Sequence, residues 1–368
     1  MSWFWQNLIT AALVGGAAAV AWMLSRRQYW RLACREIAAR PVAVASAVIL
    51  SFYVAVALAD SIGWRSPMRD PQDGTVLRHA ENGAVVYDRG RSLLDRLLGG
   101  LESRREFSYS APFARQGSWS ETVTAPDGRV QRVHPRLRYP RSHWCGTDRI
   151  GMDVLYLCFK SIRTGIIIGL LTTLIAVPFA MFFGILSGFF GGWLDDLIQY
   201  VYTVISSVPT VLFIAAFIVI FGAGLTQLCL AMGLASWTTL CRLLRAETLK
   251  LRSQDFIAAA IACGVPRWRV ILRHVVPNVL HVVIITTVLR FSSEVLSEAV
   301  LTYLGIGVGA NTMSWGTMIN DARSELTREP LVWWKLASAF VFMLGLVLPA
   351  NLFGDAVRDA LDPRLRSR

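Results

Sequence analysis

The chain has 368 residues, of which 54% are hydrophobic and only 17% are charged, and its mean hydropathy is positive. A soluble globular protein of this length is far less apolar, so the composition predicts an integral membrane protein. The formal net charge is +12. Basic loops beside membrane spans account for such an excess, and no sequence resembling a nucleic-acid module is present, so we expect membrane lipid and no nucleic acid as the partner of this charge.

Seven apolar runs are long enough to cross the hydrocarbon core of a bilayer as helices, which takes about 20 residues each. They cover residues 3–24, 42–62, 162–190, 197–221, 228–244, 279–301 and 331–353. The sequence therefore predicts an all-α polytopic membrane protein. Pro178 and Pro209 lie inside two of the runs, where each removes a backbone hydrogen bond and favours a kink, either for helix packing or as a gating hinge.

Basic residues are distributed unevenly among the connections between these runs. Residues 25–41, the loop 245–278 and the tail 354–368 are rich in arginine, whereas residues 222–227 contain no basic side chain. Positively charged loops stay on the cytoplasmic side, so we expect these three segments in the cytoplasm. With seven spans and a cytoplasmic C-terminus, the N-terminus is expected outside.

Residues 63–161 form a long polar insertion between the second and third runs. Within it, GTVLRH and GAVVYD flank AEN, and SWSETVT and RVQRVH flank APDG, which are turn signals between alternating segments. The intervening RSLLDRLLGGLESRREF has leucines at helical spacing. We therefore expect a water-exposed module with some β content.

The six cysteines and five histidines are scattered along the chain. Only Cys145 and Cys158 fall on the expected outer side, where a disulfide could persist. The sequence contains no CxxC, GxSxG or Walker A motif and no paired histidines, so we predict no metal site, no cofactor and no catalytic residue.

The loop from Asp255 to Asn278 predicts a helix-turn-helix that is too short to cross a membrane. Ala258 and Ala259 belong to an alanine-rich run that favours a helix, and Gly264 supplies a left-handed stop. Pro266 suits the start of a second helix, which Pro277 is expected to close. The second helix carries a cationic face beside an apolar face, as expected of a docking surface; its basic residues are Arg267, Arg269, Arg273 and His274.

Arg290, Glu294 and Glu298 recur every four residues on one face of the run 279–301, where contact with lipid is costly. Three interpretations remain open. An Arg290–Glu294 pair tethers neighbouring helices or a partner subunit, the residues line a pathway, or they lie at the outer interface with little consequence.

Several separated motifs resemble those of one transporter family. WCGTDRIGMDVL resembles its LGTDxxGRDVL, SGFFGGWLDDLI its GYYGGWxD turn, and SSVPTVL its SFPxLL. The loop 255–278 resembles its EAAxxxG and RHxxPN motif, SEAVLTYLGIGV and TMSWGTMI its AEAxLSFLGLG and SWGxML, and GDAVRDALDPR its GDxLRDxLDPR. From about residue 144 to residue 364, the chain resembles the second permease of oligopeptide, dipeptide and nickel ABC importers.

This resemblance implies an ABC importer type I permease core in a bacterial inner membrane. We divide the chain into an extra N-terminal span (1–24), a basic cytoplasmic segment (25–41), a span (42–62), a periplasmic insertion (63–161), a five-helix permease core (162–353) and a cytoplasmic tail (354–368). The implied partners are a second permease, two cytosolic ATP-binding subunits or one fused ATPase, and a periplasmic or extracellular solute-binding protein. The permease itself is expected to be non-catalytic and to import peptides or peptide-like solutes.

The resemblance implies that the loop 245–278 couples the permease to an ATPase. The residues expected to do so are Asp255, Ala258, Ala259, Gly264, Arg267, Arg269, Arg273, His274 and Pro277. Ala258 stands where the family usually has glutamate, and Ile261 where arginine is common. An alternative is therefore a membrane scaffold or receptor whose degenerate loop does not couple. For Arg290 and Glu294, the pathway interpretation becomes contact with a zwitterionic peptide.

Overall fold

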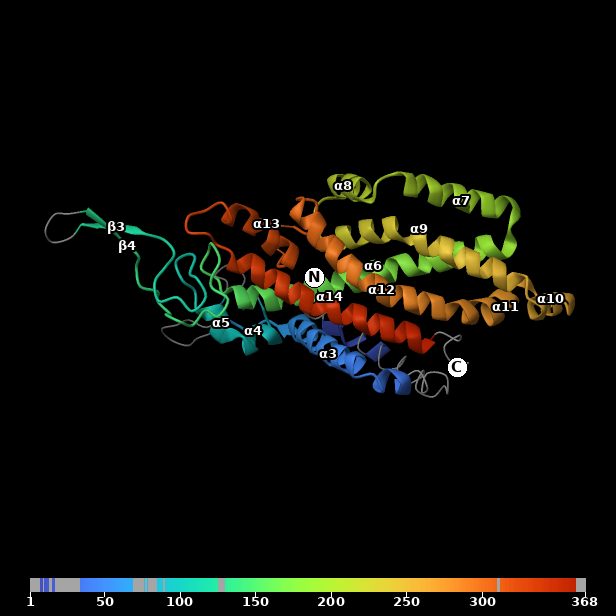
Figure 1. Cartoon of the computed structure of the whole chain (residues 1–368), viewed down its shortest axis with the longest axis horizontal. Helices are drawn as coiled ribbons and strands as arrows, with labels where there is room; N and C mark the ends of the chain where they lie inside the picture. Colours follow the sequence, from blue (N-terminus) through green and yellow to red (C-terminus); the bar gives the residue numbers. More distant parts are fainter. Residues whose placement is uncertain are drawn as a thin grey trace. The chain divides into compact units, whose positions relative to one another are not determined.

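The computed structural model describes residues 34–68, 85–88, 90–124, 130–309 and 312–361, with isolated positions in 7–16 and at 76 and 78. Most of the predicted span 3–24 lies outside the described residues. The chain divides into two compact units: a first of residues 1–32, 50–164 and 313–343, and a second of residues 33–49, 165–312 and 344–368. The elements are labelled in Figure 1.

Helices dominate the described residues. The long helices are α3 (Pro41–Ser61), α6 (Val154–Phe190), α7 (Gly192–Ser207), α8 (Thr210–Phe221), α9 (Leu225–Arg252), α12 (Val276–Tyr303), α13 (Trp315–Glu325) and α14 (Trp334–Leu361). The short helices are α4 (Leu93–Leu97), α5 (Gly99–Ser103), α10 (Asp255–Ala262), α11 (Arg267–Val270) and the π-helical turn η1 (Ile271–Val275). The strands are β1 (Gly63–Trp64), β2 (Arg91–Ser92), β3 (Glu121–Thr124) and β4 (Val130–Val133).

Among the described residues, five helices are long and apolar enough to span a membrane, and a bent pair raises the number to six. The bent pair is α7 with α8, which meet at 86° around Val208 and Pro209. The kink predicted at Pro209, within the run 197–221, is therefore present as a break between two helices. Val208, the C-cap of α7, has extended backbone, because the ring of Pro209 disfavours the α conformation at the residue before it, and Pro209 is the N-cap of α8. Pro178, by contrast, lies inside the unbroken α6.

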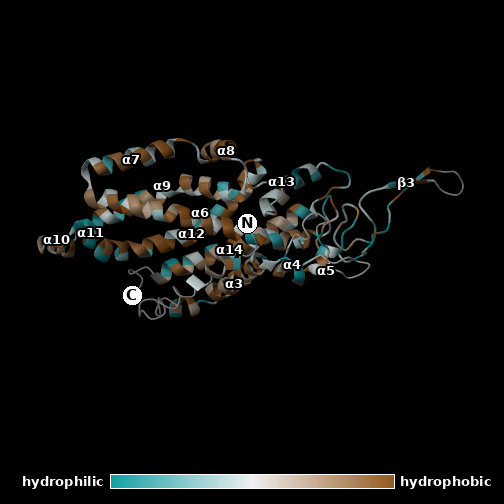
Figure 2. Ribbon diagram, turned by 180° about the vertical axis from the view of Figure 1, so that it is seen from behind, coloured by the Kyte–Doolittle hydropathy of each residue, from teal (hydrophilic) through white to brown (hydrophobic). Residues whose placement is uncertain are grey.

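The second unit is built on close packing of α6 against α9. A Cβ added at Gly184 would lie 2.7 Å from the Cys241 carbonyl oxygen, and one at Gly188 would lie 2.7 Å from that of Arg245. Larger residues would therefore force the two helices apart. Apolar side chains from α6, α7, α9, α10, η1 and α12 share one buried core, and the long helices are mainly hydrophobic in Figure 2.

The first unit contains the insertion, residues 63–161. β3 and β4 pair antiparallel with Thr124 opposite Val130, which confirms the second predicted hairpin. In place of the first predicted hairpin, the described residues contain only isolated bridges, one of them between Arg78 and Val85. The leucine-rich segment forms α4 and α5. A capping box of Ser92 and Asp95 starts α4, because each side chain satisfies the other's backbone N–H.

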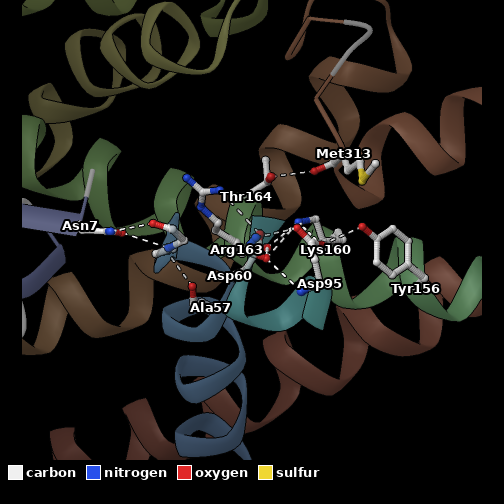
Figure 3. A network of polar contacts seen from close by, with 12 residues as sticks. Asn7, Ala57, Asp60, Asp95, Tyr156, Lys160, Arg163, Thr164 and Met313 are labelled. Carbon is white, nitrogen blue, oxygen red and sulfur yellow. Dashed lines mark hydrogen bonds and ion pairs between the residues drawn. The ribbon is translucent and has the colours of Figure 1, made fainter. Parts of the chain in front are cut away.

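A buried ion network joins the insertion to two long helices (Figure 3). Lys160 of α6 lies 2.6 Å from Asp60 of α3 and 2.8 Å from Asp95 of α4. Tyr156 donates a hydrogen bond to the same Asp95 oxygen at 2.8 Å. Burial opposes ionisation of Asp95, but the hydrogen bond from Lys160 outweighs it together with the other donors, and the pKa of Asp95 is lowered. Within the first unit, Asp60 and Asp95 therefore share the charge of Lys160.

Both candidate disulfide cysteines are free thiols in the structure. Cys145 is half-buried and Cys158 is buried. Burial raises the pKa of the Cys145 thiol. The pairing considered from the sequence is therefore not formed.

Candidate functional site

The predicted helix-turn-helix begins as expected. α9 continues to Arg252, and α10 then runs from Asp255 to Ala262. Gly264 has φ of 77°, and the N–H of Val265 donates to the Ala260 carbonyl at 3.1 Å. A left-handed residue followed by such a bond is the usual glycine end of a helix. The stop predicted at Gly264 is confirmed.

The second helix of this hairpin is not a separate element. α11 continues through the π-helical turn η1 directly into α12, so that Arg267–Tyr303 forms one helix of 37 residues. Pro277 lies in the first turn of α12, and the expectation that it closes a short helix is wrong. The wider π turn accommodates a ring that would clash with a regular α-helical ladder. We name residues 253–275 the hairpin.

The hairpin has a buried side and an exposed side. Ile257, Val270 and Val275 are fully buried in the core of the second unit. Eight of the nine residues expected to contact an ATPase are exposed, and His274 is half-buried beside the Phe256 ring. Large apolar side chains are exposed among them, at Phe256, Ile261, Trp268 and Leu272. Such a cluster on a cationic surface is typical of a protein interface.

A part-buried ion pair fixes α7 against α9. Arg245 Nε and Nη2 each lie 2.6 Å from an oxygen of Asp195, a bidentate arrangement. Asp195 belongs to the SGFFGGWLDDLI motif, directly after the glycine turn between α6 and α7. Its arginine partner lies 50 residues further on, and no local sequence signal indicates it.

The second unit also contains a polar cavity of about 370 Å³. Its lining comes from the α7–α8 break, α9 and α12, and comprises Ile205, Ser206, Val208, Thr210, Phe213, Ile214, Met232, Ala235, Ser236, Thr238, Thr239, Arg242, Arg290, Glu294 and Ser297. Several hydroxyl groups accompany the three charged side chains. A cavity of this kind between mainly apolar helices is suited to a small polar solute.

The structure separates the three polar residues predicted on α12. Arg290 and Glu294 line the cavity, but no ion pair joins them. Arg290 Nη2 instead donates to the Ser236 carbonyl of α9 at 2.7 Å. Glu298 is fully buried, accepts a hydrogen bond from Thr302 at 2.8 Å and does not line the cavity. The ion pair supposed by one of the three interpretations is therefore not formed in this structure, whereas Arg290 does link α12 to α9.

Arg242 is the cavity residue that the sequence reasoning missed. Its Nη2 donates to Ser206 Oγ at 2.8 Å, and its guanidinium lies 5.3 Å from the centroid of the Tyr202 ring. A signal was present, because Arg242 is the one charged residue within the predicted span 228–244. Charged residues in spans are costly and usually face protein or water.

Residues 180–367 match the family described as the binding-protein-dependent transport system inner membrane component. The chain belongs to this family, and it is a multi-span membrane permease. It is 32% identical over 226 residues to an oligopeptide transport system permease protein of Bacillus subtilis (strain 168), covering 61% of this chain and 73% of that protein.

A dipeptide transport system permease protein of Alkalihalophilus pseudofirmus is likewise 32% identical, over 257 residues, covering 70% of this chain and 81% of that protein. Among solved structures, an inward-facing form of the MetNI methionine ABC transporter matches with a TM-score of 0.47 and 14% identity, covering 56% of this chain and 97% of that chain. The family match and the helical spans confirm the predicted permease fold class.

Proposed function

We propose that this chain forms half of the translocation path of an ATP-driven importer of peptides or peptide-like solutes. Its partners are a second permease, cytosolic ATP-binding subunits that hydrolyse ATP, and a solute-binding protein outside. Two observations support this proposal: the family match, and similarity to permeases named for oligopeptide and dipeptide transport. The observation that carries the mechanism is the exposed hairpin on a continuous α11–η1–α12 helix.

The hairpin is suited to transmit movement. A force on the exposed Trp268 acts on the same helix that carries Arg290 and Glu294, about 22–26 residues away. At 1.5 Å per residue, this is a rigid lever roughly 35 Å long. Closure of an ATPase against the hairpin would therefore shift one wall of the polar cavity against α9.

Docking to an ATPase takes place without the usual glutamate at residue 258. Asp255 is exposed in the first turn of α10, and three arginines lie on α11 and η1. The exposed apolar side chains provide buried contact area, whereas rim charges mainly provide orientation and rate. We propose that Trp268 is the main anchor of this interface. The small Ala258 side chain would allow the ATPase to approach α10 closely.

The cavity is proposed as a solute contact of the translocation path. Arg242 and Arg290 suit a peptide carboxylate, and Glu294 suits the amino group, so the cavity offers both charges that a zwitterion needs. Both arginines already lie against hydroxyl or carbonyl partners, which limits the rearrangement needed on binding.

The test is ATP-dependent uptake of a labelled peptide by the complex reconstituted in liposomes. Trp268→Ala should abolish most uptake while membrane insertion and permease pairing persist. Trp333→Ala is the matched control, since Trp333 is similarly exposed but lies in the first unit. Two results would contradict the proposal: uptake by the wild-type complex that continues when ATP hydrolysis is blocked, or no uptake at all. Either would favour the alternative, a membrane scaffold or receptor whose loop does not couple to an ATPase.

The orientation of the chain is also part of the proposal. We place the hairpin, the segment 25–41 and the tail in the cytoplasm, and the insertion and the N-terminus outside, in the bacterial inner membrane. Cys263 is exposed beside Gly264 and offers a natural probe. In a Cys34→Ser background, a membrane-impermeant maleimide should label Cys263 in inside-out vesicles but not in intact cells. With Cys263→Ser added to that background, Ser120→Cys in the insertion should show the reverse pattern.

A further inference from the structure

Two stretches of the insertion, residues 111–118 and 134–143, lie side by side and line a cavity that is open to solvent. Their backbones are joined by hydrogen bonds from Leu137 N–H to the Arg115 carbonyl (3.2 Å) and from Arg141 N–H to the Ala114 carbonyl (2.9 Å). The cavity measures about 470 Å³ and is lined by Arg115, Gln116, Arg136, Leu137, Pro140 and Arg141. Its volume falls within the range of small-ligand sites, roughly 300–1,000 Å³.

The charge of this cavity is not compensated. Three of its six lining residues are arginines and none is acidic. Within the part of the chain that the structure describes, Arg115, Arg136 and Arg141 form no ion pair, in contrast with Lys160 and Lys335 of the same unit. The nearby Glu106 is already engaged, since its two oxygens accept the N–H groups of Arg138 and Tyr139.

The backbone of the cavity is strained at two positions. Phe113 and Arg141 have φ values of 56° and 62°, and they are the two non-glycine residues with positive φ among those described. Left-handed backbone costs free energy for a residue with a Cβ, and glycine would relieve it. Such strain persists where a particular side chain is needed, and Arg141 is one of the residues that line the cavity.

We propose that this cavity binds an organic phosphate. Three arginines and no acidic residue line one space, and arginine offers the paired N–H donors that a phosphoryl group accepts. The cavity exceeds the volume of a bare phosphate, and Leu137 and Pro140 provide apolar lining for an attached organic group. The phosphoryl group could belong to a soluble phosphoester or to a lipid headgroup, and the experiment distinguishes these sources.

The full chain in a phosphate-free detergent is titrated with glycerol 3-phosphate and, separately, with dihexanoylphosphatidylglycerol, and binding is followed by ³¹P NMR line broadening. Saturable binding of at least one titrant is expected, and Arg136→Gln should weaken it about tenfold, the loss of roughly one charged hydrogen-bonding partner. The titrant with the tighter arginine-dependent binding identifies the source. Absence of saturable binding of either titrant to the wild-type chain would overturn the proposal.

Two glycine substitutions distinguish an effect on phosphate binding from an effect on stability. Arg141→Gly and Phe113→Gly both relieve left-handed backbone, so neither should lower the thermal stability of the chain by that route. Only Arg141→Gly removes a guanidinium, and it alone should weaken phosphate binding about tenfold. Arg132→Gln, on the exposed strand β4, controls for general charge and should leave binding unchanged. Equal weakening by Arg132→Gln and Arg136→Gln would also overturn the proposal, because it would indicate only nonspecific attraction.

Discussion

Charged side chains form ion pairs in the network of the first unit, whereas within the described residues the arginines of the hairpin in the second unit lie unpaired at the surface. Lys160 lies within 2.8 Å of two carboxylates, and Lys335, only 3% exposed by its side chain, contacts Glu325 at 3.3 Å and Asp321 at 3.0 Å. The hairpin arginines lie at the surface, and no ion pair is found for them among the described residues. Charges paired within the fold stabilise it, whereas unpaired surface charges remain available to a partner.

The largest effect on stability is expected from Lys160→Met. It would leave Asp60 and Asp95 close together without their shared cation, and breaking a buried pair in this way costs about 3–5 kcal/mol. Thermal unfolding in detergent measures the loss. Lys250→Met is the matched control, because the Lys250–Glu247 pair is exposed and should contribute less than about 1 kcal/mol. Equal losses in the two variants would show that the network is not a structural clamp.

A smaller loss is expected from Arg245→Leu. Asp195 would lose both hydrogen bonds from Arg245, but the Arg245 and Asp195 side chains are 24% and 11% exposed, so water replaces part of the contact and the total loss should be about 1.5–3 kcal/mol. Arg245→Lys keeps the charge but not the bidentate geometry, so its thermal stability should fall between those of the wild type and Arg245→Leu. If Arg245→Lys were as unstable as Arg245→Leu, geometry and not charge would govern the contact.

Two aspartates of the insertion should show opposite pH dependence. Burial raises the pKa of Asp148, although hydrogen bonds from the N–H groups of Met152 and Ile150 act in the opposite direction. The protonated Asp148 therefore stabilises the folded protein, and this contribution is lost as pH rises from about 3.8 through the raised pKa. The pKa of Asp95 is lowered, so its contribution is present above about 3.8 and is lost as pH falls through the lower value. At pH 7, Asp148→Asn should therefore raise the melting temperature and Asp95→Asn should lower it.

Melting curves between about pH 3 and pH 7 check both aspartates. The stabilisation by Asp148→Asn should disappear near the acid end, because the wild-type carboxyl is then protonated in both folded and unfolded states. The amide oxygen introduced by this substitution can still accept both N–H groups, since both reach the same Asp148 oxygen. A pH-independent difference for either variant would contradict its assigned shift.

The smallest effect on stability is expected at the hairpin. Replacing Arg267, Arg269 and Arg273 together by serine should change the unfolding free energy by less than about 1 kcal/mol, because exposed substitutions typically act within about ±0.5 kcal/mol. Binding of the ATPase should nevertheless weaken and lose most of its salt dependence, as measured by surface plasmon resonance at increasing ionic strength. A large loss of stability with unchanged ATPase binding would place these arginines in the fold and not in the interface.

Features encoded in short stretches of sequence were predicted well. The β3–β4 hairpin, the stop at Gly264 and most of the span positions within the described residues each depend on neighbouring residues, and the structure contains them. Pro209 was identified as a kink, but its 86° break depends on how α7 and α8 pack against α9. Local sequence carries no information on that angle.

Contacts between distant residues were not predicted. Lys160 and Asp95 are 65 residues apart, Arg245 and Asp195 are 50 apart, and Arg290 bonds a carbonyl 54 residues away. The four-residue spacing of Arg290 and Glu294 suggested a pair within one helix, yet a backbone carbonyl of α9 was the available acceptor. Helical spacing shows which residues share a face, but not which partner each of them takes.

The π-helical turn sets the angular phase of the helix that begins at Arg267. Each residue of an α-helix advances the face by about 100°, so the residue that widens the η1 turn rotates everything after it relative to everything before it. The direction in which Trp268 projects and the direction in which Arg290 and Glu294 project are therefore related through Ile271–Val275. Deleting one residue there should leave two intact helical stretches whose functional faces no longer correspond.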